Sequence, residues 1–304
     1  MTADHLDKFL LQQRGARVIA TEIEQAWQSA QQQQPQHPAV RELLGELVAA
    51  ATLLTANLKF DGSLLLQLQG NGTVKMIVVE CRQDLSFRAT IKLNSEPQPH
   101  ELGLQALLNA DGQGRFSVIL NPPPDTPGRQ PYQGIVPLTA DSVAGVLQDY
   151  MQQSEQLDTR LWLHSNDTRL CGFLLQRMPD SGGHTDVSTQ DLAASWHHAL
   201  ALCETLTVDE LATTDLETLL KRLFWDTPIV SLESLPITWR CGCTWERVAN
   251  MLRSLGEAEV KDIIQEQGEV EVVCDFCGTP YRFDPIDSTA LFGTPRSSQP
   301  EQLH

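Results

Sequence analysis

Apolar and polar residues alternate along much of the first 180 residues, in short runs that turn signals separate. In one such run, Leu64, Leu66 and Leu68 alternate with residues that include Gln67 and Gln69. Alternation of this kind predicts strands with one buried face. The pattern predicts strands at residues 16–20, 64–69, 74–79, 87–93, 115–120, 132–138, 160–163 and 172–177. Because short turns join many of them, we expect a largely antiparallel sheet.

Helical spacing replaces alternation in three stretches of the same region. The most distinct covers residues 40–58, where an apolar stripe and an alanine-rich middle predict a buried helix. Shorter helices are predicted just before residue 30 and at residues 142–154, and residues 31–38 form a glutamine-rich connector. The resulting prediction is an α+β fold, in which residues 1–179 form a sandwich-like α/β domain with a mostly antiparallel sheet.

The pattern becomes helical beyond a glycine-containing boundary at residues 180–184. Thr207 and Glu210 are spaced as a capping box and predict the start of a short helix. Asp215 marks the start of another helix with its own apolar positions. One face of the helix that precedes them carries Leu192, Trp196, Leu200 and Cys203. We therefore predict a helical linker over residues 180–236.

Acidic residues dominate this linker. It contains ten acidic and two basic residues, so it carries nearly half of the formal charge of −17. Short helices are marginally stable alone, and such a segment stays folded only while its apolar face is docked. The sequence leaves two interpretations open, a docked metastable segment and a solvated linker.

Four cysteines near the C-terminus form the strongest chemical signal. Cys241 and Cys243 are separated by thirty residues from Cys274 and Cys277. Two close pairs at this separation are typical of a tetrahedral zinc site with four thiolate ligands. Around them we predict helices at residues 245–255 and 257–266, and a strand at 270–273 with a hairpin partner that contains Tyr281 and Phe283. The predicted zinc domain spans residues 237–290, and residues 291–304 form a tail.

The four thiols admit two other interpretations. Cys274 and Cys277 could form a thioredoxin-type redox pair, but the βαβ context is absent and the other two cysteines would be idle.

A closed metal site could also act as a staple that only folds a small module. Structural zinc contributes about 10–16 kcal/mol to folding. Disulfides within each pair would close loops of three or four residues, which contribute roughly 2 kcal/mol or less. Oxidation would therefore unfold the module, although composition alone does not separate a switch from a staple.

Charge and hydropathy exclude several classes of protein. A net charge of −17 repels phosphate backbones, and the local basic groups Arg240, Arg247 and Arg253 are few, so we expect no nucleic-acid partner. No apolar run approaches the roughly 20 residues that span a bilayer, so we expect no membrane partner. The start of the sequence lacks the regions of a secretion signal. We therefore expect a cytoplasmic protein with reduced thiols.

No catalytic constellation competes with the cysteine cluster, so we do not expect an enzyme. The adjacent His197 and His198 point apart on a helix and are expected on a solvated face. Residues 70–73 lack the lysine of a phosphate-binding loop. Trp196 and Trp225 are interpreted as docking residues of the linker. The roles of the remaining cysteines are not assigned by the pattern: Cys81, Cys171 and Cys203.

The sequence resembles the heat-shock-protein-33 family of redox-regulated bacterial chaperones over nearly its whole length. The resemblance depends first on the spacing of Cys241, Cys243, Cys274 and Cys277. Five further segments carry it: LLTANLKFDG at 53–62, LQLQGNG at 66–72, YQGIV at 132–136, SEQLDTR at 154–160 and GFLLQ at 172–176. The glutamine-rich connector and the three additional cysteines depart from the family pattern.

The resemblance implies a function and a mechanism. Members are inactive monomers when reduced and bound to one zinc ion per chain. Oxidants such as hypochlorite form one disulfide within each cysteine pair and expel the zinc, which here implies Cys241–Cys243 and Cys274–Cys277. The zinc domain and the linker then unfold, and the chain dimerises. This active form holds unfolding client proteins without ATP and passes them to ATP-dependent foldase chaperones. The client surface, oxidant threshold, order of disulfide formation and dimer interface do not follow from the sequence.

Overall fold

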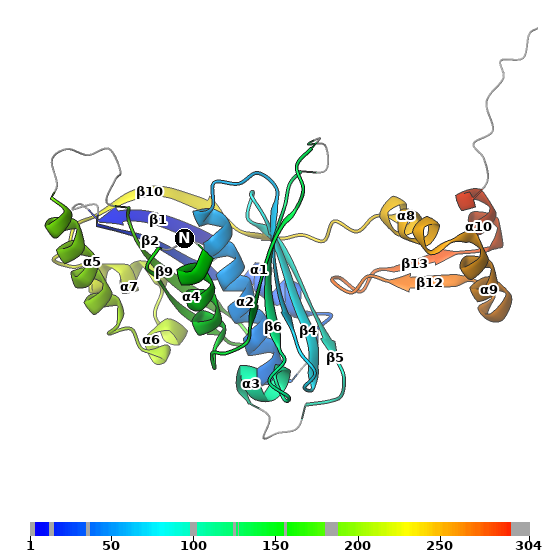
Figure 1. The fold of residues 1–304 in the computed structure, drawn as a ribbon, viewed down its shortest axis with the longest axis horizontal. Coiled ribbons are helices and arrows are strands. Elements are labelled where there is room, and N and C mark those ends of the chain that lie inside the picture. The colour runs from blue at the N-terminus through cyan, green and yellow to red at the C-terminus, as the bar shows by residue number, and fades with distance from the viewer. Residues whose placement is uncertain are drawn as a thin grey trace, which may run out of the picture. The chain divides into compact units, whose positions relative to one another are not determined.

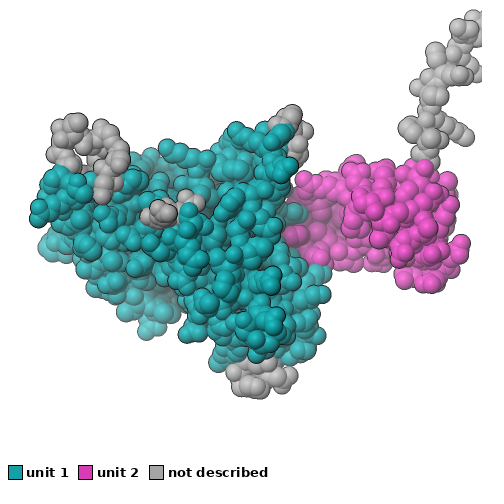
Figure 2. Space-filling model, viewed as in Figure 1, with its two compact units in different colours: residues 1–240 teal, residues 241–304 magenta. Residues whose placement is uncertain are grey.

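The chain folds into two compact units, residues 1–240 and 241–304 (Figure 2). The computed structural model describes residues 4–11, 15–34, 37–97, 102–123, 126, 128–154, 157–179 and 188–292. The first unit, which we call unit 1, contains two sheets, and the second, unit 2, contains a hairpin with three helices (Figure 1). Among the described residues, none of the helices has the length and apolarity that crossing a bilayer requires.

A five-stranded antiparallel sheet forms one layer of unit 1, with the order β10-β1-β2-β9-β8. Its strands are β1 (Asp4–Leu11), β2 (Ala16–Ile23), β8 (Thr159–Ser165), β9 (Leu170–Arg177) and β10 (Ile229–Pro236). Both faces of this sheet are covered, because neighbouring residues of β2 belong to different apolar clusters: Ile19 to one, Val18 and Ala20 to the other.

A six-stranded sheet forms the second layer, with the order β11-β5-β4-β3-β6-β7. Its strands are β3 (Ser63–Gln69), β4 (Val74–Arg82), β5 (Ser86–Leu93), β6 (Arg115–Asn121), β7 (Tyr132–Pro137) and β11 (Thr238–Trp239). All pairings are antiparallel except that of β11 with β5. The predicted fold class, α+β with mostly antiparallel strands, is confirmed, and the strands are divided between two sheets.

Helix α2 (Pro38–Asn57) lies in the main core and contacts strands of both sheets. The residues of its alanine-rich middle are fully buried, so small side chains allow strands to approach on more than one side. Three shorter helices complete this part of the core: α1 (Gln25–Gln31), α3 (Gly103–Leu108) and α4 (Val143–Ser154). The buried helix predicted at residues 40–58 is therefore confirmed.

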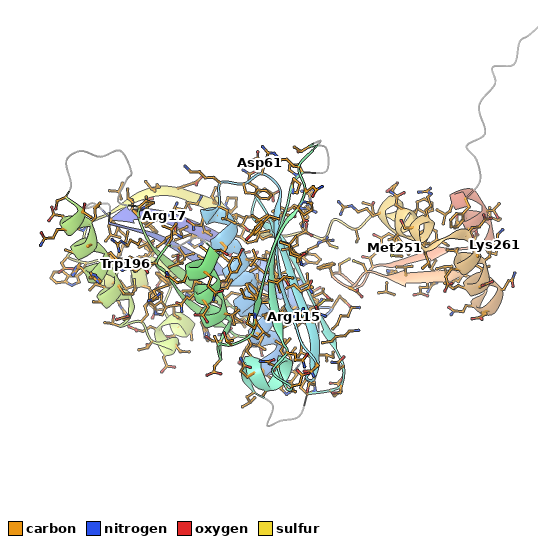
Figure 3. The ribbon with its side chains drawn as sticks, in the orientation of Figure 1. Arg17, Asp61, Arg115, Trp196, Met251 and Lys261 are labelled. Atoms are coloured by element: carbon orange, nitrogen blue, oxygen red, sulfur yellow. The ribbon has the colours of Figure 1, made fainter. Side chains whose placement is uncertain are left out.

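Three helices cover the other face of the five-stranded sheet (Figure 1): α5 (Thr189–Cys203), α6 (Val208–Thr213) and α7 (Leu216–Leu223). Trp196, labelled in Figure 3, is 3% exposed. It belongs to the apolar cluster between these helices and the sheet, together with strand residues such as Phe173 and Val18. The capping box of Thr207 and Glu210 is present, and Asp215 caps α7. In this structure the linker helices are docked rather than solvated.

The linker prediction was wrong in two places. Trp225 is 80% exposed, so it is not a docking residue. Residues 229–236 are not helical but form strand β10, which pairs antiparallel with β1. The predicted boundary at residues 180–184 lies outside the described residues, as does the part of the predicted tail from residue 293 onward.

Unit 2 is built around a two-stranded hairpin of β12 (Val270–Val273) and β13 (Pro280–Phe283). Helices α8 (Trp245–Leu255) and α9 (Glu257–Gln267) precede it, and α10 (Pro285–Phe292) follows. The predicted helices and hairpin are confirmed, whereas α10 extends beyond residue 290, where the zinc domain was expected to end. The apolar core of this unit is small: Ala249, Leu252, Val260, Val270, Phe283 and Leu291.

Helix α2 also places a titratable carboxyl group in a poorly hydrated position. Burial raises the pKa of Glu46 from 4.5 to about 7, and repulsion from Glu42 adds to the rise. A raised carboxyl pKa means that the folded state favours the protonated form. The contribution of protonated Glu46 to the free energy of unfolding is therefore fully present below the unfolded pKa of 4.5, and it is lost as the pH rises through about 7.

The Glu46→Gln variant is therefore expected to unfold with a free energy close to that of the wild type at about pH 5, and to be more stable at about pH 8.5. The gain is at most roughly 3 kcal/mol, since one pKa unit corresponds to about 1.4 kcal/mol. Urea denaturation of the reduced protein at the two pH values measures this gain in stability, with Asp149→Asn, at an exposed position of α4, as the control. A pH-independent difference between Glu46→Gln and the wild type would contradict the prediction.

Candidate metal centre

Two loops of unit 2 supply the four cysteines of the candidate site. Cys241 and Cys243 lie in the irregular segment that leads into α8, where the Arg247 guanidinium donates to the Gly242 carbonyl at 2.7 Å. Cys274 and Cys277 lie in the turn between β12 and β13. The backbone N–H of Cys274 donates to the Thr279 carbonyl at 2.9 Å and closes this turn.

Gly278 is required by the geometry of that turn. Its φ of 70° is in the left-handed region, which favours glycine because a Cβ is disfavoured there. Its backbone N–H donates to the Cys274 carbonyl at 2.8 Å. The Cys-x-x-Cys-Gly sequence therefore folds so that both sulfurs of the hairpin turn can approach the Cys-x-Cys loop.

The four sulfur atoms lie within 4.8 Å of one another. Cys241 Sγ is 3.7 Å from Cys274 Sγ, and Cys243 Sγ is 3.4 Å from Cys277 Sγ. With zinc–sulfur bonds of about 2.3 Å, the sulfurs of a tetrahedral site are ~3.8 Å apart. The observed separations are close to that value, and each of the seven cysteines of the chain is a free thiol. Four thiolates are soft ligands that favour zinc in tetrahedral geometry. The four cysteines and their sulfur–sulfur distances therefore fit a zinc ion.

The local environment changes the acidity of these thiols in different directions. Burial raises the pKa of Cys241 to about 12 and raises that of Cys274 as well. Burial also acts on Cys277, but hydrogen bonds from the hydroxyl and backbone of Thr279, and from Cys243 and Cys241, outweigh it and lower its pKa to about 7. The Thr279 Oγ1 atom is 3.1 Å from the Cys277 sulfur. Sequence reasoning missed Thr279, because nothing in the pattern marks a threonine two residues after a cysteine.

The other residues considered from the sequence lie elsewhere. Cys81, Cys171 and Cys203 are buried in unit 1, and burial raises the pKa of each thiol to about 12. The adjacent His197 and His198 are exposed, as predicted, and His198 is 2.9 Å from the Thr227 hydroxyl. Within the described part of the chain, Cys241, Cys243, Cys274 and Cys277 form the one group of three or more potential metal ligands that converge.

The fold and this centre define a class: an α+β protein with a small C-terminal unit that can bind a metal through four thiols. The family model described as Hsp33 protein matches residues 4–284. The chain belongs to the Hsp33 family, which is a family of chaperones.

Relatives of similar length support this membership. The chain is 40% identical over 293 residues to the 33 kDa chaperonin of Methylobacillus flagellatus, covering 96% of this chain and 95% of the relative. It is 35% identical to the 33 kDa chaperonin of Pseudomonas aeruginosa, covering 99% and 98%. The crystal structure of the 33 kDa chaperonin of Thermotoga maritima, a heat shock protein 33 homolog, superposes with a TM-score of 0.77 at 20% identity over 95% of this chain and 98% of that one. The structural likeness shows that the fold is shared.

Proposed function

We propose that this protein is a redox-regulated, ATP-independent holdase chaperone, inactive when reduced and bound to one zinc ion. The observation that carries the proposal is the convergence of four free thiols, from two sequence-local pairs, in a unit with a small core. The ligands would be Cys241, Cys243, Cys274 and Cys277. A bound zinc ion would hold the four thiolates together and so fix the two loops relative to each other.

Oxidation supplies the switch. Each pair of thiolates would give up two electrons to an oxidant such as hypochlorous acid. One sulfur–sulfur bond forms, and the oxidant takes up one proton from solvent and is reduced to chloride and water. The proposed products are Cys241–Cys243 and Cys274–Cys277. The oxidised cysteines no longer offer thiolates as ligands, so the two loops lose the metal ion that they share. Disulfides across the pairs, such as Cys241–Cys274, would instead tie the two loops together and keep unit 2 closed.

The energetic balance supports unfolding of unit 2. A structural zinc site contributes about 10–16 kcal/mol to folding at neutral pH. Two disulfides that close loops of three or four residues contribute roughly 2 kcal/mol or less each. The small apolar core of unit 2 does not offset this difference, since domains of this size need a metal or disulfides.

The linker of residues 180–236 would transmit the change. Strand β10 continues through β11 directly into Cys241, so the linker and the metal centre are joined along the chain. Unfolding of the linker would uncover apolar residues that the docked helices bury, among them Phe173 and Trp196. We further propose that the oxidised chain dimerises, binds unfolding client proteins, and transfers them to ATP-dependent foldases in the cytoplasm. The reduced chain would be a monomer, and no enzymatic activity is proposed.

Zinc stoichiometry and an aggregation assay, measured on the same sample, test this function. The reduced protein is expected to contain one zinc ion per chain and to leave the aggregation of a heat-denatured client unchanged. After hypochlorite treatment, zinc is expected in the filtrate, and the protein is expected to suppress aggregation. Peptide mapping is expected to find disulfides within the two pairs.

Reduction with a dithiol in the presence of zinc is the control, because it is expected to restore the inactive state. Zinc retained after oxidation, or equal activity of the reduced protein, would be incompatible with the proposal. Disulfides across the pairs would contradict the proposed pairing.

A further inference from the structure

A buried ion pair lies beneath the junction between helices α6 and α7. Glu22, on β2, forms an ion pair with Arg169, which precedes β9, and Oε1 of Glu22 lies 3.0 Å from Nε of Arg169. Both side chains are 10% exposed. Removing one partner of such a pair leaves an uncompensated buried charge, which is strongly destabilising.

Both members of the pair also hold the linker. The Glu22 carboxylate accepts at 3.1 Å from the backbone N–H of Leu216, the first residue of α7. The Arg169 guanidinium donates to the Thr214 carbonyl at 2.5 Å and to the Ala212 carbonyl at 3.4 Å. The ion pair is therefore attached to the linker on both sides of the α6–α7 junction.

The signs of the charges match the helix ends that they meet. Helix N-termini leave N–H groups without partners and favour an anion, as Glu22 provides at α7. Helix C-termini leave carbonyl groups without partners and favour a cation, as Arg169 provides at α6.

The hydrogen bonds of the ion pair depend on direction, whereas the apolar contacts of the linker helices do not. The residues of α7 that face the sheet are leucines, and an apolar face tolerates sliding because burial does not depend on direction. Three hydrogen bonds to a fixed ion pair specify one position of the α6–α7 junction on the sheet.

We propose that Glu22 and Arg169 form a polar latch that holds α6 and α7 on the five-stranded sheet, so that losing either side chain undocks the linker while the metal centre stays intact. Docking itself can be tested without reference to any activity. The proposal depends on the proposed function only for its consequence, namely that undocking activates the chaperone.

Three buried thiols provide a readout. Cys171 and Cys203 belong to the apolar cluster under the linker helices and are 0% and 1% exposed. Cys81 is 0% exposed in the main core, away from the linker. Alkylation of a buried thiol reports how often the structure above it opens. Cys171 and Cys203 therefore report undocking, and Cys81 reports unfolding of the rest of unit 1.

The experiment is alkylation of the reduced, zinc-loaded full-length protein with N-ethylmaleimide, read at each cysteine by mass spectrometry. In Arg169→Met and Glu22→Gln, labelling of Cys171 and Cys203 is expected to be faster than in the wild type by about a hundredfold, as breaking a buried pair implies. Labelling of Cys81 and the zinc content are expected to be unchanged. Arg169→Lys keeps the charge without the forked geometry and is expected to give an intermediate rate.

Glu80→Gln is the matched control. It removes a carboxylate that pairs with Arg88 in the six-stranded sheet and is 14% exposed, and it is expected to leave Cys171 and Cys203 protected. Removing Arg169 also removes a charge that lowers the pKa of Cys171, which by itself slows alkylation. Faster labelling in Arg169→Met is therefore not a pKa effect on Cys171. The charge of Glu22 raises the pKa of Cys171, so Glu22→Gln by itself favours alkylation there, and the comparison in that variant depends on Cys203, whose raised pKa comes from burial and from Glu204.

Each outcome decides the proposal. Protection of Cys171 and Cys203 in both Arg169→Met and Glu22→Gln overturns the latch, and so does equal labelling of Cys81, which would assign the pair to the stability of the whole unit. Faster labelling of Cys171 and Cys203 alone supports the latch. If that labelling comes without suppression of client aggregation, the latch stands and the proposed route of activation fails.

Discussion

Replacing Cys274 and Cys277 together by serine is expected to abolish zinc binding and leave unit 2 unfolded, while unit 1 keeps its fold. The two serines remove both thiols that the β12–β13 turn contributes to the cluster. A hydroxyl does not replace a thiolate as a ligand for zinc. The contribution that is lost, about 10–16 kcal/mol, is as large as the total stability of a typical domain. Only six buried apolar residues form the core of unit 2 that would have to offset this loss.

Metal analysis after dialysis tests the loss of zinc. Limited proteolysis followed by mass spectrometry tests the unfolding of unit 2. Cleavage is expected within residues 241–292 of the variant, with unit 1 recovered intact. The control is Cys81→Ala, which removes a thiol of the main core and is expected to keep one zinc ion per chain. Tight zinc binding by the double-serine variant would show that the ligands are assigned wrongly.

Leu220→Asp is expected to produce chaperone activity without an oxidant. Leu220 is 6% exposed and packs in the apolar cluster between the linker helices and the sheet. Truncating a buried leucine costs about 2–5 kcal/mol, and burial of an unpaired carboxylate adds to that cost. The docked linker consists of short helices, which are marginal without their apolar face, so α7 is expected to leave the sheet.

The measurement is aggregation of a heat-denatured client in reducing buffer, together with the zinc content of the variant. Zinc is expected to be retained, because Leu220 belongs to unit 1 and not to the metal centre. Lys221→Asp is the control: it places a carboxylate one position away, where the side chain is 71% exposed, and is expected to stay inactive until oxidised. Full dependence of Leu220→Asp on oxidant would argue against linker docking as the restraint.

Local patterns were sufficient for much of the fold. Strand β3 alternates buried leucines with less buried residues, as the sequence pattern requires, and the helix at α2 follows its apolar stripe. Capping at Thr207 and Asp215 was also predictable, because a cap depends on residues within one turn. For the centre, the spacing of the four cysteines predicted a cluster of thiols, whose sulfurs lie within 4.8 Å of one another.

Strand β10 shows where local patterns fail. Most of its residues are exposed, so it has no alternating buried face for the sequence to display. Its backbone pairs with β1, which lies more than 200 residues earlier in the sequence as the first strand of unit 1. This pairing makes the segment a strand. Trp225 shows the same limit, because a large apolar side chain is interpreted as buried unless the tertiary structure leaves it at the surface.

The sequence by itself determined the class of fold, the helices and strands with strong periodicity, and the four thiols that can share a metal ion. These features depend on residues close together in the chain or on cysteine spacing, and both are visible in the order of amino acids. Only the tertiary structure decided that the strands form two sheets, that the linker helices dock on one of them, and that Glu22 meets Arg169 beneath that linker. Such contacts join residues far apart in sequence, and their partners are chosen by how the packed elements exclude water and satisfy buried polar groups.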